Sequence, residues 1–388
     1  MFPYLAEILT DYWGPFRLLG SYFVLIGIGG CLAMVLTYWL LPKYWDSLPH
    51  DQGKALVKGG EIAKGKPTGA GIIMVSIFTA ICLLIMPFNP RMFGLLCCLY
   101  ACMLTGYLDD RSSKPWGRLK KGLLDTAISI AAAWILCRGG TMKIWLPFIS
   151  SVNEGGCFFI PAAYYIPVAA FILWVCINVV NCSDGVDGLA GSLSLLSLFC
   201  LGAFLYGITG HFRMAEYLLL PHYPDGARWA LMLYTACGML AGYIWHNAKP
   251  SAVLMGDAGS RFLGLLVGLA GLASGNPFMI LVVCPILVID GGAGLVKIVL
   301  LRTLKKFGLD VRMPLSKVVN PIHPENFATD EEAAKQARIV RWIHHYRFPP
   351  HDQCRKEWKW SDTQVLVRFM LLQAVITPLF ILLFIKLR

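Results

Sequence analysis

Five aspartates in this chain have the spacing expected of a site that handles a metal ion and phosphate. Asp109 and Asp110 are adjacent, Asp184 and Asp187 are three residues apart, and Asp257 follows a glycine. Adjacent carboxylates repel each other, and a shared cation or nearby basic groups relieve that repulsion. Carboxylates bind Mg²⁺ together with substrate phosphate oxygens. The aspartates therefore predict a Mg²⁺ site for a diphosphate, while helix capping or solvation remains the alternative for the adjacent pair alone.

Basic residues accompany the first aspartate pair. Lys114, Lys120 and Lys121 follow Asp109 and Asp110 within the same short segment. Lysine side chains bind phosphate as point charges. We therefore expect Lys114 and Lys121 to contact the substrate.

The second aspartate pair ends a run of four polar residues. Asn178, Asn181, Asp184 and Asp187 recur at three-residue spacing, so neighbouring members can share one helix face. Polar side chains at the end of an aliphatic helix are costly unless they meet water, a metal or a polar ligand. Capping explains one of these residues but not four, which favours a functional cluster.

The fifth aspartate stands at a predicted helix start. Gly256 and Gly259 allow close backbone approach around Asp257, and Ser260 follows. A helix N-terminus with free amides favours phosphate. The alternative is that Asp257 and Ser260 act only as helix caps.

The elements that must position these residues are membrane helices. Hydrophobic residues make up 57% of the 388 residues and charged residues 15%, against roughly 25% charged in soluble domains. About 20 apolar residues cross a bilayer. The sequence predicts an all-α polytopic membrane protein, a single domain over residues 1–388, with about ten spans at 18–41, 68–88, 92–108, 122–137, 158–181, 189–208, 227–246, 261–275, 278–301 and 363–386.

Charge position predicts the orientation of these spans. Most of the 34 Lys and Arg fall on one side, in or at the edges of loops 42–67, 109–121, 182–188, 247–260 and 302–362. The positive-inside rule places that side in the cytoplasm and both termini outside, although topology alone can explain most individual charges. A basic cytoplasmic face attracts anionic lipid headgroups and anionic soluble substrates. No nucleic-acid partner is expected.

All five aspartates fall on this predicted cytoplasmic side. A proton relay inside the membrane would instead place its acids near the middle of a span. Within the predicted spans the charged residues include Asp125, Asp290 and Lys297, and Asp125 lies close to a span end. The pattern favours a metal and diphosphate site over a proton relay. A secondary transporter remains the alternative of another class, because ten spans and broken helices are ordinary there.

These motifs resemble the polyprenyl-phosphate N-acetylhexosamine-1-phosphate transferases over nearly the whole chain. The resemblance rests on Asp109-Asp110, the run from Asn178 to Ala190, and Met255 to Ser260. Gly65 to Gly71, which includes Thr68, is similar to a further family motif. The stretch from Trp360 to Phe369 favours the muramoyl-pentapeptide branch over relatives that use UDP-GlcNAc, which remain the nearest alternative.

The resemblance implies the reaction and its partners. That branch moves phospho-MurNAc-pentapeptide from UDP-MurNAc-pentapeptide to undecaprenyl phosphate, releasing UMP and forming lipid I for peptidoglycan. It implies Mg²⁺, a homodimer and a multi-pass position in the bacterial plasma membrane with a cytoplasmic site. Whether a family carboxylate acts as base or as covalent nucleophile stays open.

The resemblance also implies roles for individual residues. By this resemblance, Asp257 and Asp184 are expected to bind Mg²⁺. Asp109 is expected to act near the lipid phosphate, with Asp110 beside it. The remaining assignments are a catalytic cluster of Asn178, Asn181 and Asp184, uridine contacts from Gly185, Val186, Asp187 and Asn247, and substrate contacts from Thr68, Lys114, Lys121, Gly256 and Ser260.

Three features depart from the family pattern. A triple histidine is expected before the last span, but the chain reads Pro349 to Gln353 with His351 alone. We assign His351 to catalysis, with His323 and the pair His344-His345 as rivals. Leu254 stands where the family often has a phenylalanine, and loop 302–362 is long.

The ninth predicted span carries helix-breaking residues. Pro285, Gly291, Gly292 and Gly294 interrupt an otherwise aliphatic segment. A bent helix there could shape a groove for the polyprenyl tail, and a simple packing kink is the alternative.

Overall fold

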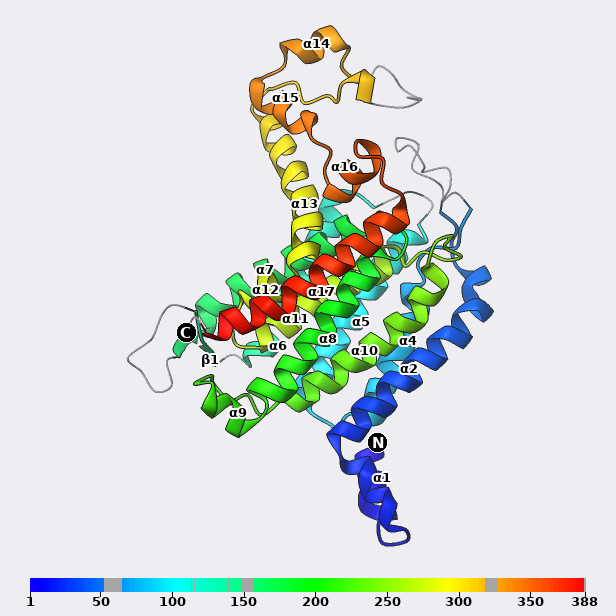
Figure 1. The fold of residues 1–388 in the computed structure, drawn as a ribbon, viewed down its shortest axis with the longest axis vertical. Helices are drawn as coiled ribbons and strands as arrows, with labels where there is room; N and C mark the ends of the chain where they lie inside the picture. Colours follow the sequence, from blue (N-terminus) through cyan, green and yellow to red (C-terminus); the bar gives the residue numbers. More distant parts are fainter. Residues whose placement is uncertain are drawn as a thin grey trace.

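The computed structural model describes residues 1–51, 65–112, 114, 116–138, 140–147, 157–317 and 327–386, and most of them are helical. Every predicted span contains a helix (Figure 1). These helices are α2 (Tyr22–Tyr44), α4 (Gly71–Ile85), α5 (Pro90–Asp110), α6 (Arg118–Cys137), α7 (Ala162–Ser183), α8 (Leu189–Phe204), α10 (Gly226–Asn247), α11 (Gly256–Ala273), α13 (Pro285–Lys306) and α17 (Asp362–Lys386).

Shorter elements connect these helices. They are α1 (Phe2–Leu9), η1 (Gly14–Gly20), η2 (Trp45–Ser47), η4 (Leu205–Thr209), α9 (Phe212–Tyr217), α12 (Met279–Val283), η5 (Leu315–Lys317), α14 (Asp330–Lys335), α15 (Arg338–His345) and α16 (Pro350–Lys356). The last three give structure to the long segment 302–362.

Several helices have the length and composition of membrane spans. Among the described residues, five qualify: Tyr22–Ser47, Pro90–Asp110, Ala162–Ser183, Leu189–Thr209 and Asp362–Lys386. Apolar side chains on such helices favour hydrocarbon, and the helix satisfies its own backbone hydrogen bonds. The length and composition of these helices confirm the prediction of a helical polytopic membrane protein.

A small sheet corrects the all-α prediction at one place. Residues 158–161 were predicted to begin the fifth span, but they form strand β2 (Phe158–Pro161), which pairs antiparallel with β1 (Thr141–Ile144). Phe158, Phe159 and Ile160 have side chains that favour strands. Pro161 has no N–H to donate and stands immediately before α7, so the helix begins only at Ala162.

Helix α11 forms the centre of the helical body. Every residue from Ala258 to Ala273 is buried, and α11 packs against α4, α5, α6, α7 and α8. Its glycines permit this close packing. A Cβ on Gly268, for example, would lie 2.9 Å from a methyl carbon of Leu173 on α7. From Phe262 to Ala273 the helix is apolar on all sides, and such a helix is buried in this way.

The start of α11 is the point of closest packing. A Cβ on Gly106 of α5 or on Gly71 of α4 would overlap the backbone of Asp257 to Gly259. The hydrogen bonds from Ala70 N–H to Leu254 O (3.1 Å) and from Gly71 N–H to Met255 O (3.2 Å) add a direct connection. These contacts place Asp257 between the ends of two other helices.

The predicted ninth span is broken, but at only one of the predicted positions. Helix α12 ends at Val283, Cys284 has non-helical angles, and α13 begins at Pro285. Gly291, Gly292 and Gly294 lie inside continuous α13, where Gly291 contacts the backbone of α7 and a Cβ on Gly294 would lie 2.9 Å from Pro349. Figure 1 shows α13 diverging from the other long helices.

Both ends of the chain lie away from the loops that carry the aspartates. Helix α2 leads to Pro49, whose carbonyl accepts the N–H of Thr68 (2.8 Å). Helix α17 starts at Asp362, which pairs with Lys249 at 2.5 Å. The start of α2 and the end of α17 are therefore at the opposite end of the body, as Figure 1 shows.

Gly106→Ala tests the close packing at α11. The added Cβ would overlap the carbonyl of Asp257, and overpacking costs about 1–3 kcal/mol. We expect a lower midpoint of thermal unfolding in detergent, measured by intrinsic fluorescence.

Gly122→Ala is the matched control, because nothing lies within 4 Å of a Cβ there. Alanine also has the higher helix propensity, so the control midpoint should stay equal or rise. An unchanged midpoint for Gly106→Ala would contradict the packing argument.

Candidate functional site

Asp110 binds the first turn of α11. The N–H of Asp257 donates to Asp110 Oδ1 (3.2 Å) and the N–H of Ala258 donates to Asp110 Oδ2 (3.1 Å). Helix N-termini leave such amides without intrahelical partners. Asp110 therefore serves as a cap supplied by α5, and these two amides are not free for a phosphate. Gly256, with φ +67°, allows this approach because a side chain there would overlap Asp110.

Lys121 joins two of the predicted carboxylates. Its Nζ lies 3.0 Å from Asp257 Oδ2 and forms an ion pair with Asp109 Oδ2. Asp109 also accepts the backbone N–H of Trp116 at 2.7 Å. Asp109 is buried, whereas the side chain of Asp257 is 28% exposed. One ammonium thus relieves the repulsion between an inner and an outer carboxylate.

Asn181 completes the surroundings of Asp257. Its Nδ2 donates to Asp257 Oδ1 (2.9 Å) and to Ser260 Oγ (3.0 Å). Asn181 comes from the last turns of α7, so residues of four helices, α5, α6, α7 and α11, meet here. Asn178 has a different place, because its Nδ2 donates to Trp174 O (2.8 Å) within α7.

The ionisation of this cluster follows from its contacts. Burial alone would raise the pKa of Asp257, but the charge of Lys121 and the hydrogen bond from Asn181 outweigh it and hold that pKa below its ordinary value. Burial alone would lower the pKa of Lys121, but Asp257 and Asp109 outweigh it and raise that pKa. The arrangement is a stable charge cluster with Asp257 ionised.

The residues fit a Mg²⁺ ion only in part. Among the described residues, no three His, Cys, Asp or Glu side chains form a group that could hold a metal. Mg²⁺ commonly uses one or two carboxylates and completes its shell with water and substrate phosphates. The partly exposed, ionised Asp257 suits that mode, so it is the strongest candidate ligand.

The predicted uridine segment is held by Asn247. Its Oδ1 accepts the N–H of Gly188 and its Nδ2 donates to Val253 O, both at 2.7 Å. Asn247 is buried, so its amide links segment 184–188 to segment 249–255. Lys66 lies across this junction, 2.9 Å from Ser251 Oγ and 4.0 Å from Asp187 Oδ2. Lys66 was not among the predicted site residues, although it lies in the motif that resembles the family.

The other predicted substrate contacts lie around this junction. Thr68 follows Lys66 by two residues and binds Pro49 through its backbone. Gly185 contacts His351 and Val186 is buried. Asp184 ends α7, three residues after Asn181. Lys114 is exposed in the described part of segment 109–121.

His351 belongs to a buried network centred on Asp290. The backbone N–H of His351 donates to Asp290 Oδ1 (2.9 Å), its Nδ1 lies 2.8 Å from Asp290 Oδ2, and Ser183 Oγ donates to the same oxygen (2.7 Å). His351 Nε2 lies against Gly185. Asp290 therefore orients the imidazole toward the loop that starts at Asp184.

The structure separates His351 from its rivals. His344 is buried in α15 with Nε2 3.2 Å from Val311 O, and His345 is exposed. His323 lies outside the described residues. Asp290 is a site residue that the sequence analysis missed, since it was noted only as an acid inside a span. The sequence could have indicated Asp290 as a site residue, because a carboxylate inside a membrane helix requires a polar partner.

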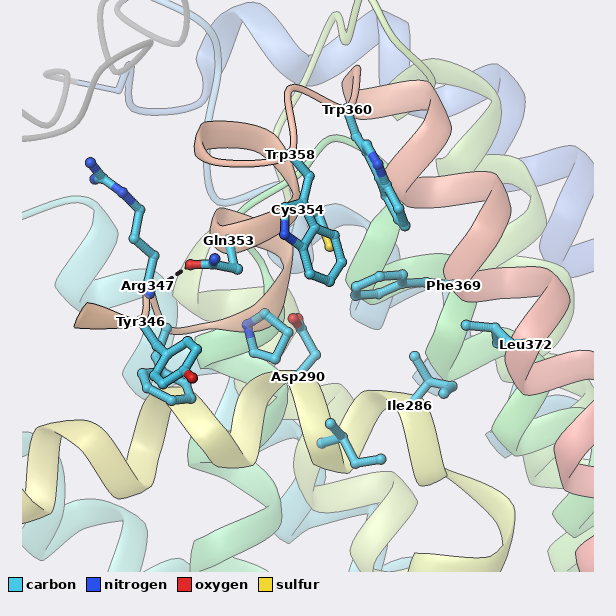
Figure 2. A pocket seen from close by; sticks show the side chains of 13 residues that line it. Ile286, Asp290, Tyr346, Arg347, Gln353, Cys354, Trp358, Trp360, Phe369 and Leu372 are labelled. Atoms are coloured by element: carbon cyan, nitrogen blue, oxygen red, sulfur yellow. Dashed lines mark hydrogen bonds between the residues drawn. The ribbon is translucent and has the colours of Figure 1, made fainter. Parts of the chain in front are cut away.

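A cavity of about 330 Å³ lies beside this network (Figure 2). Its walls come from α13, from α17 and from the segment that carries α16. Figure 2 shows Asp290 at its floor with aromatic rings around it. The lining is otherwise mainly apolar and includes Ile286, Ile289, Tyr346, Phe348, Trp358, Trp360, Phe369 and Leu372.

Fold and site together define a helical membrane protein with a polar, phosphate-suited cluster at one end of its central helix. Residues 92–275 match the model of glycosyl transferase family 4. The phospho-N-acetylmuramoyl-pentapeptide-transferase of Treponema pallidum is 40% identical over 382 residues, which is 96% of this chain and 94% of the relative. This chain belongs to the phospho-N-acetylmuramoyl-pentapeptide-transferase family.

More distant members support the same assignment. The transferase of that name from Helicobacter hepaticus is 32% identical over 248 residues, covering 60% of this chain and 68% of the relative. The Campylobacter jejuni protein is 29% identical over 280 residues, covering 68% and 77%.

Asp290→Ala tests the histidine network. The substitution removes the acceptor of three hydrogen bonds, and each buried donor left unsatisfied costs about 1–3 kcal/mol. We expect backbone amides of residues 350–356 to exchange with deuterium at least about tenfold faster, measured by mass spectrometry.

Asp352→Ala is the control within α16. The ion pairs of Asp352 with Lys356 and Arg355 are partly exposed to solvent, and such pairs contribute little to stability. Its exchange should match the wild type. Equal exchange in Asp290→Ala and Asp352→Ala would refute an anchoring role of Asp290.

Proposed function

We propose that this protein transfers phospho-MurNAc-pentapeptide from UDP-MurNAc-pentapeptide to undecaprenyl phosphate, forming lipid I and UMP for peptidoglycan synthesis. Family membership supports the reaction. In this chain the supporting observation is the position of Lys121, which forms ion pairs with both Asp109 and Asp257, while Asn181 donates a hydrogen bond to Asp257. Such a cluster places a cationic ammonium beside carboxylates, where a phosphate and its counter-cation could bind.

We further propose a Mg²⁺ ion as cofactor, with Asp257 as its protein ligand and Asp184 as a second candidate. A bound Mg²⁺ would neutralise charge on the leaving phosphate. The support is the chemistry of the donors, since Asp257 is ionised and partly exposed.

Lys121 and Asp109 suit the acceptor side of the reaction. The ammonium of Lys121 can attract the acceptor phosphate, and Asp109 holds Lys121 in place. We favour direct attack, because the acceptor phosphate is already an anionic nucleophile and needs no covalent intermediate. His351, oriented by Asp290, lies next to segment 184–188 and suits contact with the nucleotide sugar.

The apolar tail of the acceptor suits the cavity beside α13. Its mainly apolar walls open between helices α13 and α17, next to Asp290. This arrangement agrees with a groove shaped by the broken ninth span. We propose ten spans with both termini outside, a cytoplasmic site in the bacterial plasma membrane, and a homodimer.

A defined-substrate assay tests the function. Purified protein in detergent, with Mg²⁺ and undecaprenyl phosphate, should release UMP and form a lipid-linked product from UDP-MurNAc-pentapeptide. UDP-GlcNAc should give no product. Lipid-linked product from UDP-GlcNAc alone would assign the chain to the other branch, and absence of UMP release with either donor would favour a transporter.

Asp257→Asn tests the metal assignment. The change keeps the size of the side chain but removes the charge that binds a cation. We expect turnover to fall at least about a hundredfold, with a weaker dependence on Mg²⁺ concentration in the UMP-release assay.

Asp46→Asn is the control, because Asp46 is an exposed carboxylate after α2. It should retain wild-type turnover and metal response. A wild-type metal response in Asp257→Asn would show that another group binds the ion.

A further inference from the structure

Helix α15 presents three distinct stripes of side chains. Val340, Ile343 and His344 are buried, and His344 Nε2 lies 3.2 Å from Val311 O. Ile339 and Trp342 form a second stripe with Tyr346, which stands immediately after the helix, and the three side chains are 43%, 57% and 44% exposed. Large apolar side chains exposed together in this way mark an interaction surface.

The third stripe is basic. Arg338, Arg341 and His345 recur at spacings of three and four on the neighbouring exposed face. Residues 336–350 contain three arginines and no acidic residue. An exposed apolar stripe beside a basic stripe is typical of helices that lie in the membrane interface and contact anionic headgroups.

In the part of the chain that the structure describes, Arg338 and Arg341 form no ion pair with an acidic side chain. Arg312 pairs with both Asp310 (3.0 Å) and Glu332 (3.3 Å). Hydrogen bonds from Arg312 hold the pKa of Asp310 below its ordinary value. Arg312 therefore engages both of these carboxylates, while Arg338 and Arg341 stay exposed.

The position of α15 fits a bilayer surface. Helix α13 exposes the apolar stripe Ile289, Val296 and Val299, and its last turn ends in the exposed Lys305 and Lys306. Lysines at the end of an apolar helix extend to the membrane interface. Figure 1 shows α15 beside this end of α13.

The exposed aromatic stripe also continues into the cavity beside α17. Trp342 packs on Tyr346 (5.9 Å between ring centroids) and Tyr346 on Phe348 (6.4 Å). Tyr346 and Phe348 line the cavity whose other walls are α13 and α17. The exposed apolar surface of α15 is therefore continuous with the cavity that we propose for the apolar tail of the acceptor.

From these observations we propose that α15 is an interfacial helix that binds anionic phospholipid headgroups through Arg338 and Arg341 and inserts Ile339 and Trp342 among the lipids. This binding holds the end of α13 and the following α16 at the membrane surface. The inference rests on the proposed membrane orientation but not on the transfer reaction.

Hydrogen exchange of the full-length protein in lipid nanodiscs tests the proposal. One set of discs contains phosphatidylcholine alone and the other contains phosphatidylcholine with phosphatidylglycerol. We expect the amides of residues 336–348 to exchange about tenfold more slowly with phosphatidylglycerol. The double variant Arg338→Gln with Arg341→Gln should lose most of that difference.

Arg17→Gln with Arg213→Gln is the matched control, because it removes the same charge from exposed positions outside α15. It should keep the full lipid effect at residues 336–348. Equal exchange of wild-type α15 in both discs overturns the proposal, as does an undiminished lipid effect in the α15 variant. UMP release measured on the same discs reports separately on the proposed reaction.

Discussion

The capping of α11 by Asp110 is the constraint on which the site depends. Central α11 is buried from Ala258 to Ala273, so the amide of Ala258 in its first turn requires a partner within the protein. Asp110 supplies that partner from another helix, and this requires α5 to approach until only glycine fits at Gly106 and Gly256. The position of Asp257 follows from this packing.

The contacts of the charged side chains around Asp257 follow from that position. Asp109 and Asp110 are neighbours on α5, yet their carboxylates have different tasks: Asp110 caps α11 and Asp109 binds Lys121. Lys121 then reaches Asp257 from α6, and Asn181 reaches it from α7. A phosphate that enters meets an ammonium and a carboxylate already fixed by other contacts, so little rearrangement of these groups is needed.

The sequence predicted where the polar segments meet, but not which atoms pair. Apolar segments and Lys/Arg asymmetry are local properties, and they were enough to place Asp109, Asn181 and Asp257 at one end of the body. Asp290 was missed because its partner His351 is 61 residues away. Only the folded chain shows such a pairing. The strand at Phe158 was missed for a similar reason, since β1 stabilises it from outside the segment.

Asp290 connects the two chemically different parts of this protein. On one side its carboxylate binds His351, whose ring lies against Gly185 in the polar loop. On the other side it lies at the floor of the apolar cavity between α13 and α17 (Figure 2). Because Pro285 separates α13 from α12, α13 can diverge from the body and still carry Asp290 to α7 and α16. A lipid chain in the cavity and a polar substrate near His351 would therefore both lie close to the Asp290 side chain, which brings apolar and polar reactants together at a carboxylate already bound by His351 and Ser183.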